Sequence, residues 1–269
     1  MMQYLIAVDL EGIHGVVGEP NLGLRCSIAD YQVAIEGAVV EINAAAKALF
    51  DSGATKVVVW DNHGGGGNID FSKVDSRVEQ IIPDNSLPRM YFCKDYNFAG
   101  ILFIGYHAKE GTLGGVLAHT YSSVNNQYLK VNGQQLGELD FDSCIAGEFG
   151  IPALFAAGDD KATAQMLQCN PDTVTVLTKY GKGRNAADFR AREDVVKDIY
   201  DGVRLAVSKG VKPVTFRYDC DFEIRYTRME TAAAVYESLK TKLFDLRYGE
   251  DAHTLQATLR NMDDLRLFF

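Results

Sequence analysis

Residues 4 to 12 read Tyr-Leu-Ile-Ala-Val-Asp-Leu-Glu-Gly, a short apolar run that leads directly into two acidic residues and a glycine. Four similar apolar or β-branched runs follow, at Lys56–Trp60, Ile101–Gly105, Ala153–Ala157 and Thr173–Leu177. Short runs of this kind, separated by helical or loop segments, are typical of a mostly parallel sheet with helices on its faces. The sequence therefore predicts an α/β fold in which a mostly parallel sheet is flanked by helices.

Two long helices are expected between and after these strands. Apolar residues recur every three or four positions over Tyr31–Leu49, Ser27 can cap the start of this helix, and Gly53 follows its end. A second helix is expected from a cap at Asn185 to about Lys209, where a glycine follows as its stop.

The apolar pattern changes in the last third of the chain. Residues 214–218, 222–226 and 255–259 alternate apolar and polar side chains at period two, which is typical of strands buried on one face only. We therefore expect an α/β catalytic domain over residues 1–180 and a smaller α+β part over residues 181–269, entered through the second long helix.

Composition and charge exclude several classes of protein. The chain has 269 residues, 47% of them hydrophobic and 23% charged, which is typical of a globular protein. Its 27 basic and 36 acidic side chains give a formal net charge of −9, so nucleic acid and membrane surfaces are not expected partners. No apolar run reaches the roughly 18 residues that cross a bilayer, and Asp9 interrupts any signal-peptide core, which predicts a cytoplasmic protein. The five scattered cysteines, without a C-x-x-C pair, predict reduced structural thiols.

Polar side chains follow three of the expected strands. Asp9 and Glu11 come after the first strand, His63 after the second and His107 after the third. Because the carboxyl ends of parallel strands open onto one edge of the sheet, these four side chains are expected to converge. Carboxylates and imidazoles without a thiolate are the ligands expected of catalytic zinc, or of manganese or cobalt. The sequence therefore predicts a metal site at this edge.

Two further residues are candidates for the same site. His119 follows His107 by twelve positions and is the natural general base or nucleophile, because an imidazole titrates near neutral pH. Glu138 lies just past a tight hairpin turn predicted at Asn132-Gly133, at the expected start of a helix. His253 lies in a polar loop and has no expected role.

Six short motifs stand in a fixed order between residues 4 and 185. They are Asp9-Leu10-Glu11-Gly12, Asp61-Asn62-His63, Gly105-Tyr106-His107-Ala108, Gly115-Val116-Leu117-Ala118-His119, Gly137-Glu138-Leu139 and Ala157-Gly158-Asp159-Asp160-Lys161-Ala162. In this order and spacing the chain resembles the self-compartmentalising zinc D-aminopeptidases of the bacterial dipeptide-transport operon.

The resemblance implies a function, a cofactor and an assembly. It implies a binuclear zinc aminopeptidase that hydrolyses short peptides, such as D-Ala-D-Ala, from the free N-terminus. It implies a homo-oligomer, a decamer of stacked pentamers whose channel admits only short peptides. His119 would be the catalytic residue, and the ligands of the two zinc ions would be Asp9, Glu11, His63, His107 and Glu138.

Four charged residues in the later motifs have other expected roles. Lys179 and Arg184 match basic positions of the family and could hold a peptide carboxylate or a developing oxyanion. Asp159 and Asp160 are expected to cap the helix that follows them.

Two alternative functions remain open at the level of sequence. The same ligands serve other binuclear metal hydrolases such as phosphoesterases, but these predict a basic phosphate pocket. The glycines at 64–67 directly follow His63 and precede Asn68 rather than Lys-Ser/Thr, so they fit a phosphate-cradling loop poorly. A non-catalytic, metal-dependent peptide-binding protein would bind the metal without turning over any peptide.

Overall fold

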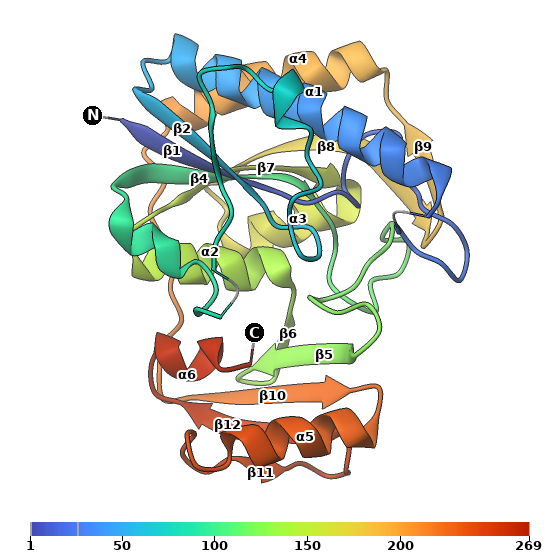
Figure 1. The fold of residues 1–269 in the computed structure, drawn as a ribbon, viewed down its shortest axis with the longest axis vertical. Helices are drawn as coiled ribbons and strands as arrows, with labels where there is room; N and C mark the ends of the chain where they lie inside the picture. The colour runs from blue at the N-terminus through green and yellow to red at the C-terminus, as the bar shows by residue number, and fades with distance from the viewer. Residues whose placement is uncertain (1, 26, 85, 269) are drawn as a thin grey trace.

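A seven-stranded sheet forms the larger part of the computed structural model, which describes residues 2–25, 27–84 and 86–268 (Figure 1). The strands are, in spatial order, β3 (Glu79–Ile81), β2 (Lys56–Asp61), β1 (Gln3–Val8), β4 (Phe98–Tyr106), β7 (Ala153–Asp159), β8 (Val174–Gly183) and β9 (Ala186–Phe189). All neighbours run parallel except β8 and β9. The five apolar runs are thus confirmed as β1, β2, β4, β7 and β8, and the α/β fold class is confirmed with them.

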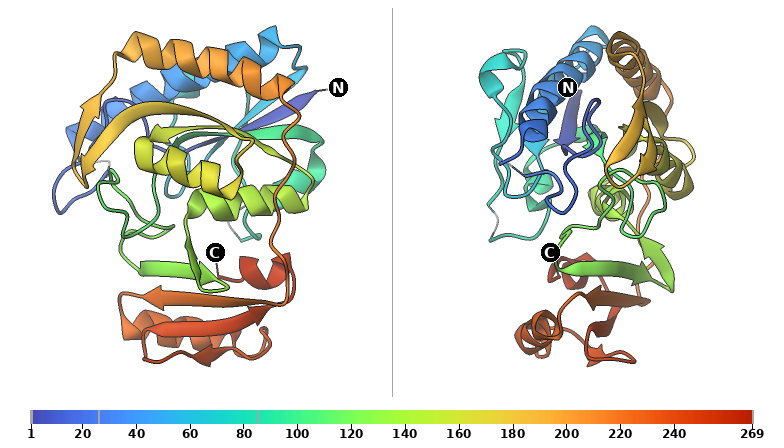
Figure 2. Two further views of the ribbon diagram at one scale, coloured as in Figure 1. Left: turned by 180° about the vertical axis from the view of Figure 1, so that it is seen from behind. Right: turned by 90° about the vertical axis from the view of Figure 1, so that its right-hand side faces the viewer.

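Helices cover both faces of this sheet, as Figure 2 shows from two sides. One face carries α1 (Ala29–Asp51) and α4 (Arg192–Ser208), and the other carries α2 (Glu138–Glu148) and α3 (Asp160–Cys169). Alternate residues of β1 enter separate cores: Leu5 and Ala7 lie in the core of α2 and α3, whereas Ile6 and Val8 lie in that of α1 and α4. Burial on both faces explains why the strands read as unbroken apolar runs.

A second, antiparallel sheet lies below α2 in Figure 1. Its strands are β11 (Arg247–Tyr248), β12 (Thr254–Leu259), β10 (Cys220–Tyr226), β5 (Asn126–Val131) and β6 (Gln134–Leu136), in that order. Short elements complete the fold: α5 (Met229–Leu239), α6 (Met262–Arg266) and the 3₁₀ turns η1 (Phe71–Lys73) and η2 (Tyr91–Asp95). Phe222 of β10 and Phe141 of α2 share one apolar cluster, so the small sheet packs onto the large part.

Period-two patterns predicted two of three strands in this region. β10 and β12 occupy the expected ranges 222–226 and 255–259, and the hairpin at Asn132-Gly133 joins β5 to β6 with positive φ at both residues, 50° and 77°. The strand expected at 214–218 is wrong, because these residues cross from α4 to β10 without pairing. Their alternate side chains are still half-buried, so the pattern recorded burial on one side of an extended segment.

The starts of both long helices differ from expectation. The N-cap position of α1 is occupied by the buried Ile28. The expected cap, Ser27, lies one residue earlier. The cap at Asn185 is wrong: β8 continues to Gly183, the chain turns back into β9, and α4 begins only at Arg192. The Asn185 side chain instead donates from Nδ2 to the Val17 carbonyl at 2.8 Å.

The chain passes between the two sheets more than once. β5 and β6 belong to the small sheet although they precede residue 180, and α4 covers the large sheet although it follows that residue. The expected division into residues 1–180 and 181–269 therefore does not coincide with the division between the sheets. As a statement about domains it stays a prediction.

The described cysteines carry free thiols, as expected, namely Cys93, Cys144, Cys169 and Cys220, whereas Cys26 lies outside the described residues. Over the ranges that the structure covers, none of the helices combines the length and apolar character needed to cross a membrane.

Asp159 caps α3, as the sequence predicted. Its Oδ1 accepts from the backbone N–H groups of Lys161 and Ala162 at 3.0 and 2.7 Å, and its Oδ2 accepts from Val116 N–H at 2.8 Å. Asp160 is the first residue of the helix rather than a cap, and it accepts from Gly181 N–H. Asp159 thus joins α3 to the loop that leads to His119.

Asp159→Ala should lower the free energy of unfolding by about 2–4 kcal/mol, because it removes a helix cap and leaves the buried Val116 N–H without an acceptor. Asp70→Ala is the matched control: Asp70 caps the exposed turn η1, and its loss should shift the unfolding midpoint much less. Urea unfolding of both variants measures the difference. Equal midpoints for the two would contradict the double role of Asp159.

Candidate metal centre

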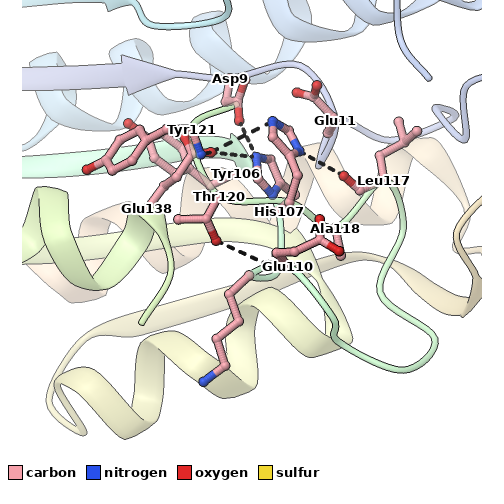
Figure 3. A network of polar contacts seen from close by, with 12 residues as sticks. Asp9, Glu11, Tyr106, His107, Glu110, Leu117, Ala118, Thr120, Tyr121 and Glu138 are labelled. Atoms are coloured by element: carbon pink, nitrogen blue, oxygen red, sulfur yellow. Dashed lines mark hydrogen bonds and ion pairs between the residues drawn. The ribbon is translucent and has the colours of Figure 1, made fainter. Parts of the chain in front are cut away.

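The carboxyl ends of β2, β1 and β4 lie side by side and carry the predicted ligands. Asp9 directly follows β1, His63 lies two residues past β2, and His107 directly follows β4. Glu138 is the first residue of α2 and reaches the same edge from the opposite side. Figure 3 shows Asp9, His107 and Glu138 pointing toward one another, with Glu11 beside them.

Gly12 allows the loop with the acidic pair to cross the end of β4. Its N–H donates to the Gly105 carbonyl at 2.6 Å, and a Cβ at this position would lie 2.1 Å from the Tyr106 carbonyl oxygen. Only glycine permits this approach, which brings the loop of Asp9 and Glu11 against the end of β4, directly before His107.

Carboxylate oxygens and imidazole nitrogens meet at short range. His63 Nδ1 lies 3.0 Å from Asp9 Oδ1 and 3.1 Å from Glu11 Oε2. His107 Nε2 lies 3.3 Å both from Asp9 Oδ2 and from Glu138 Oε1. His119 Nε2 lies 3.8 Å from the same Glu138 oxygen, and its ring stacks on that of His107 with centroids 3.9 Å apart. The six residues that sequence reasoning selected are therefore in one cluster.

Backbone carbonyls orient the two stacked imidazoles. His107 Nδ1 lies 2.9 Å from the Ala108 carbonyl, and His119 Nδ1 lies 2.9 Å from the Leu117 carbonyl. A proton on each Nδ1 leaves both Nε2 atoms as lone-pair donors that face the carboxylates. This arrangement is the usual support for a metal-ligating histidine.

The charges of the cluster require a cation or protons to balance them. Burial lowers the pKa of His63, but the Glu11 charge and hydrogen bonds with Asp9 and Glu11 outweigh it and raise this pKa to about 12. Burial likewise opposes, and the Glu138 charge raises, the pKa of His107, which reaches about 10. A divalent cation can replace these protons, and its binding would release them.

Two groups of atoms are close enough to hold metal ions. One ligand atom from each of Asp9, Glu11 and His107 lies within 4.8 Å of the others, and the same holds for His107, His119 and Glu138. His107 Nε2 is buried and accepts no hydrogen bond from the described residues, as expected of an atom that ligates a metal. Oxygen and nitrogen donors without thiolate suit catalytic zinc, so the residues fit this metal.

The cluster lies at the base of an open pocket of about 590 Å³. The carboxylates of Asp9, Glu11 and Glu138 and the imidazoles of His63 and His119 line it, whereas His107 is buried behind them. A small substrate can therefore reach the cluster from solvent.

The chain matches a known family of proteins over nearly its whole length. The family model Peptidase_M55, described as D-aminopeptidase, matches residues 2–264. The chain belongs to this D-aminopeptidase family. Membership confirms the predicted resemblance and, at the level of the family, the expected class of enzyme, a metallo-aminopeptidase.

The chain is also similar to a curated protein sequence and to a solved structure. A D-aminopeptidase of Bacillus subtilis (strain 168) is 30% identical over 187 residues, which make up 69% of this chain and 66% of the relative. The solved structure of the Zn-dependent D-aminopeptidase DppA from Bacillus subtilis, a self-compartmentalizing protease, covers 99% of this chain and 94% of its own. Its TM-score is 0.85 at 23% identity, so the two chains share one fold.

The two basic residues that match the family do not belong to the described residues that line the pocket. Lys179 is completely buried and donates to the carbonyls of Glu11, Ile13 and Val16 at 2.6–2.8 Å. A role in binding substrate is therefore wrong for Lys179, which instead holds the loop behind the acidic pair. Arg184 donates from Nη1 to the Ala118 carbonyl at 2.7 Å and so positions the loop of His119.

Sequence reasoning missed Arg89 and Tyr121, which also line the pocket. Arg89 lies in an irregular segment just before η2, and Tyr121 lies in the loop after His119. Neither residue belongs to a periodic element or to one of the six motifs, so no local signal could have identified them.

Proposed function

We propose that the protein is a binuclear zinc aminopeptidase that removes the N-terminal residue of short peptides, including D-amino-acid dipeptides such as D-Ala-D-Ala. The observation that supports this most strongly is the pair of overlapping ligand groups that share His107 at the base of an open pocket. The Zn-dependent relative supports the choice of metal.

The residues that would hold zinc are Asp9, Glu11, His63, His107 and Glu138, and the chemistry supplied there would be activation of water and polarisation of the peptide carbonyl. His119 would accept and transfer the proton. Burial lowers the pKa of His119, so its imidazole is neutral at neutral pH and can accept a proton at Nε2.

The carboxylates also give the substrate its orientation. Glu11 and Glu138 line the pocket and can accept hydrogen bonds from the free amino group of a peptide. A blocked N-terminus would lose these bonds, which fits removal of residues from a free N-terminus.

The charge of the pocket favours a peptide over a phosphate ester. A phosphoesterase would need a basic pocket, but among the described lining residues Arg89 is the one arginine or lysine beside three carboxylates. Bound metal without turnover of any peptide would support the remaining alternative, a non-catalytic peptide-binding protein.

Release of amino acids from a panel of D- and L-dipeptides and tripeptides tests the proposal. Zinc-loaded protein should release the N-terminal residue, and the same preparation treated with a chelator should lose this activity and regain it when zinc is returned. We expect turnover of D-Ala-D-Ala to exceed that of L-Ala-L-Ala. Activity that survives complete removal of metal would overturn the proposal.

We further propose that the protein forms a homo-oligomer. The relative described as a self-compartmentalizing protease supports this. The resemblance to the self-compartmentalising D-aminopeptidases implies a decamer. Location in the cytoplasm stays a prediction from the sequence.

A further inference from the structure

Arg89 stands out in the pocket because of its charge. The described residues that line the pocket include three carboxylates, and Arg89 is the one lysine or arginine among them. A peptide with a free C-terminus carries a carboxylate, which the acidic residues would repel. Within these lining residues, Arg89 is thus the natural partner for that carboxylate.

The guanidinium of Arg89 is held in a fixed orientation. Nε and Nη2 donate to the two carboxylate oxygens of Asp142 at 2.6 and 2.7 Å. The guanidinium carbon also lies 4.9 Å from the centre of the Trp60 ring and 4.7 Å from that of the Tyr121 ring. A side-chain cation that is already held by a bidentate ion pair and two aromatic rings loses little conformational entropy when it binds a ligand.

One edge of this guanidinium remains available. Nη1 donates to none of the described residues, and it is not among the enclosed unpartnered atoms, so it is accessible. The side chain retains 15% of its surface, and it lines both the metal-site pocket and a neighbouring pocket of about 220 Å³ beside the Gly64–Gly67 loop.

Asp142 does not cancel the binding capacity of Arg89. It is fully buried and also accepts hydrogen bonds from the hydroxyls of Tyr106 and Tyr121, at 2.9 and 3.1 Å. Its charge is therefore shared among three donors. Both N–H groups on Nη1 can therefore donate hydrogen bonds to a ligand.

Tyr121 connects Arg89 to the metal cluster. Its backbone N–H donates to Glu138 Oε1 at 2.6 Å, while its ring packs against the guanidinium. Tyr121 therefore contacts both the proposed ligand Glu138, through its backbone, and Arg89, through its ring.

We propose that Arg89 Nη1 binds the C-terminal carboxylate of a short peptide and makes the enzyme prefer peptides with a free C-terminus. This inference rests on the proposed aminopeptidase function. Arg89 would be a specificity-determining residue, and Asp142 would position it.

Comparison of D-Ala-D-Ala with its C-terminal amide tests the inference on the unaltered, zinc-loaded protein. The free acid should have a kcat/KM roughly 10- to 100-fold higher than the amide, mainly through a lower KM, because the amide loses a charge-assisted hydrogen bond. Equal kcat/KM values for both peptides would overturn the inference and leave the aminopeptidase function intact. Absence of cleavage of either peptide would overturn the proposed function, and the inference with it.

The double variant Arg89→Gln/Asp142→Asn assigns the preference to Arg89 without leaving Asp142 as an unpaired buried charge. The ratio of kcat/KM for acid and amide should fall to about 1, because the variant can no longer distinguish a carboxylate from an amide. If Arg89 were only structural, both activities would fall together and the ratio would be unchanged. Arg190→Gln/Asp198→Asn, an ion pair that does not line the pocket, is the matched control and should retain the preference.

Discussion

His107→Ala is expected to abolish both zinc binding and peptide turnover. His107 belongs to both groups of ligand atoms, and its buried Nε2 lies 3.3 Å from oxygens of Asp9 and Glu138. Bound metal supplies several kcal/mol of transition-state stabilisation, so kcat/KM should fall by roughly 10³-fold or more. Metal content of the purified variant and release of D-alanine from D-Ala-D-Ala measure the two effects.

The control for this variant is His253→Ala. The His253 ring contacts the Tyr226 carbonyl at 3.1 Å and lies outside both ligand groups of the described residues. This variant should therefore keep its zinc and its activity. A His107→Ala protein that retained zinc and turned over peptide would remove His107 from the metal centre.

The grouping of the candidate site residues was predictable from the sequence because four of them follow the ends of strands. The buried strands β1, β2 and β4 can be recognised as apolar runs, and parallel pairing brings whatever follows them to one edge. Asp9, Glu11, His63 and His107 needed no other information to be placed together. The positions of His119 and Glu138 in the same cluster depended on the order of the motifs, since both come from loops and helix starts that periodicity does not fix.

Residues that act through distant partners could not be found in this way. Arg89 is held by Asp142, which lies 53 positions later in the chain, and nothing local to either residue signals the pair. Lys179 looks like a basic residue available for substrate, but its ammonium group is enclosed by carbonyls that lie more than 160 positions earlier. Only the folded chain shows that it supports the acidic loop.

The start of α4 illustrates a different limit. Asn185 is a favourable helix cap by its residue type, but tertiary pairing of β8 with β9 uses the residues around it in a hairpin. The competing structure depends on an edge of the sheet that is assembled from the rest of the chain. Local preference therefore placed the helix start too early.

His119→Ala is expected to lower kcat by about 10²–10⁴-fold while the protein keeps its zinc. His119 lines the pocket, and its Nδ1 is tied to the Leu117 carbonyl, so Nε2 is the atom that faces substrate. The lowered pKa keeps this nitrogen unprotonated at neutral pH and ready to accept a proton. Metal content and steady-state kinetics with D-Ala-D-Ala check both parts of the expectation.

Metal content distinguishes the two chemical roles that the geometry allows for His119. Its Nε2 lies 3.8 Å from Glu138 Oε1 and belongs to one group of atoms that could hold an ion. If it ligates zinc, His119→Ala must lose metal as His107→Ala does; if it moves protons, the metal stays and only turnover falls. Because the two rings stack with their centroids 3.9 Å apart, the two variants remove neighbouring imidazoles of the same cluster. Retained zinc with lost turnover would assign His119 to proton transfer, and loss of zinc would make it a ligand and contradict its catalytic assignment.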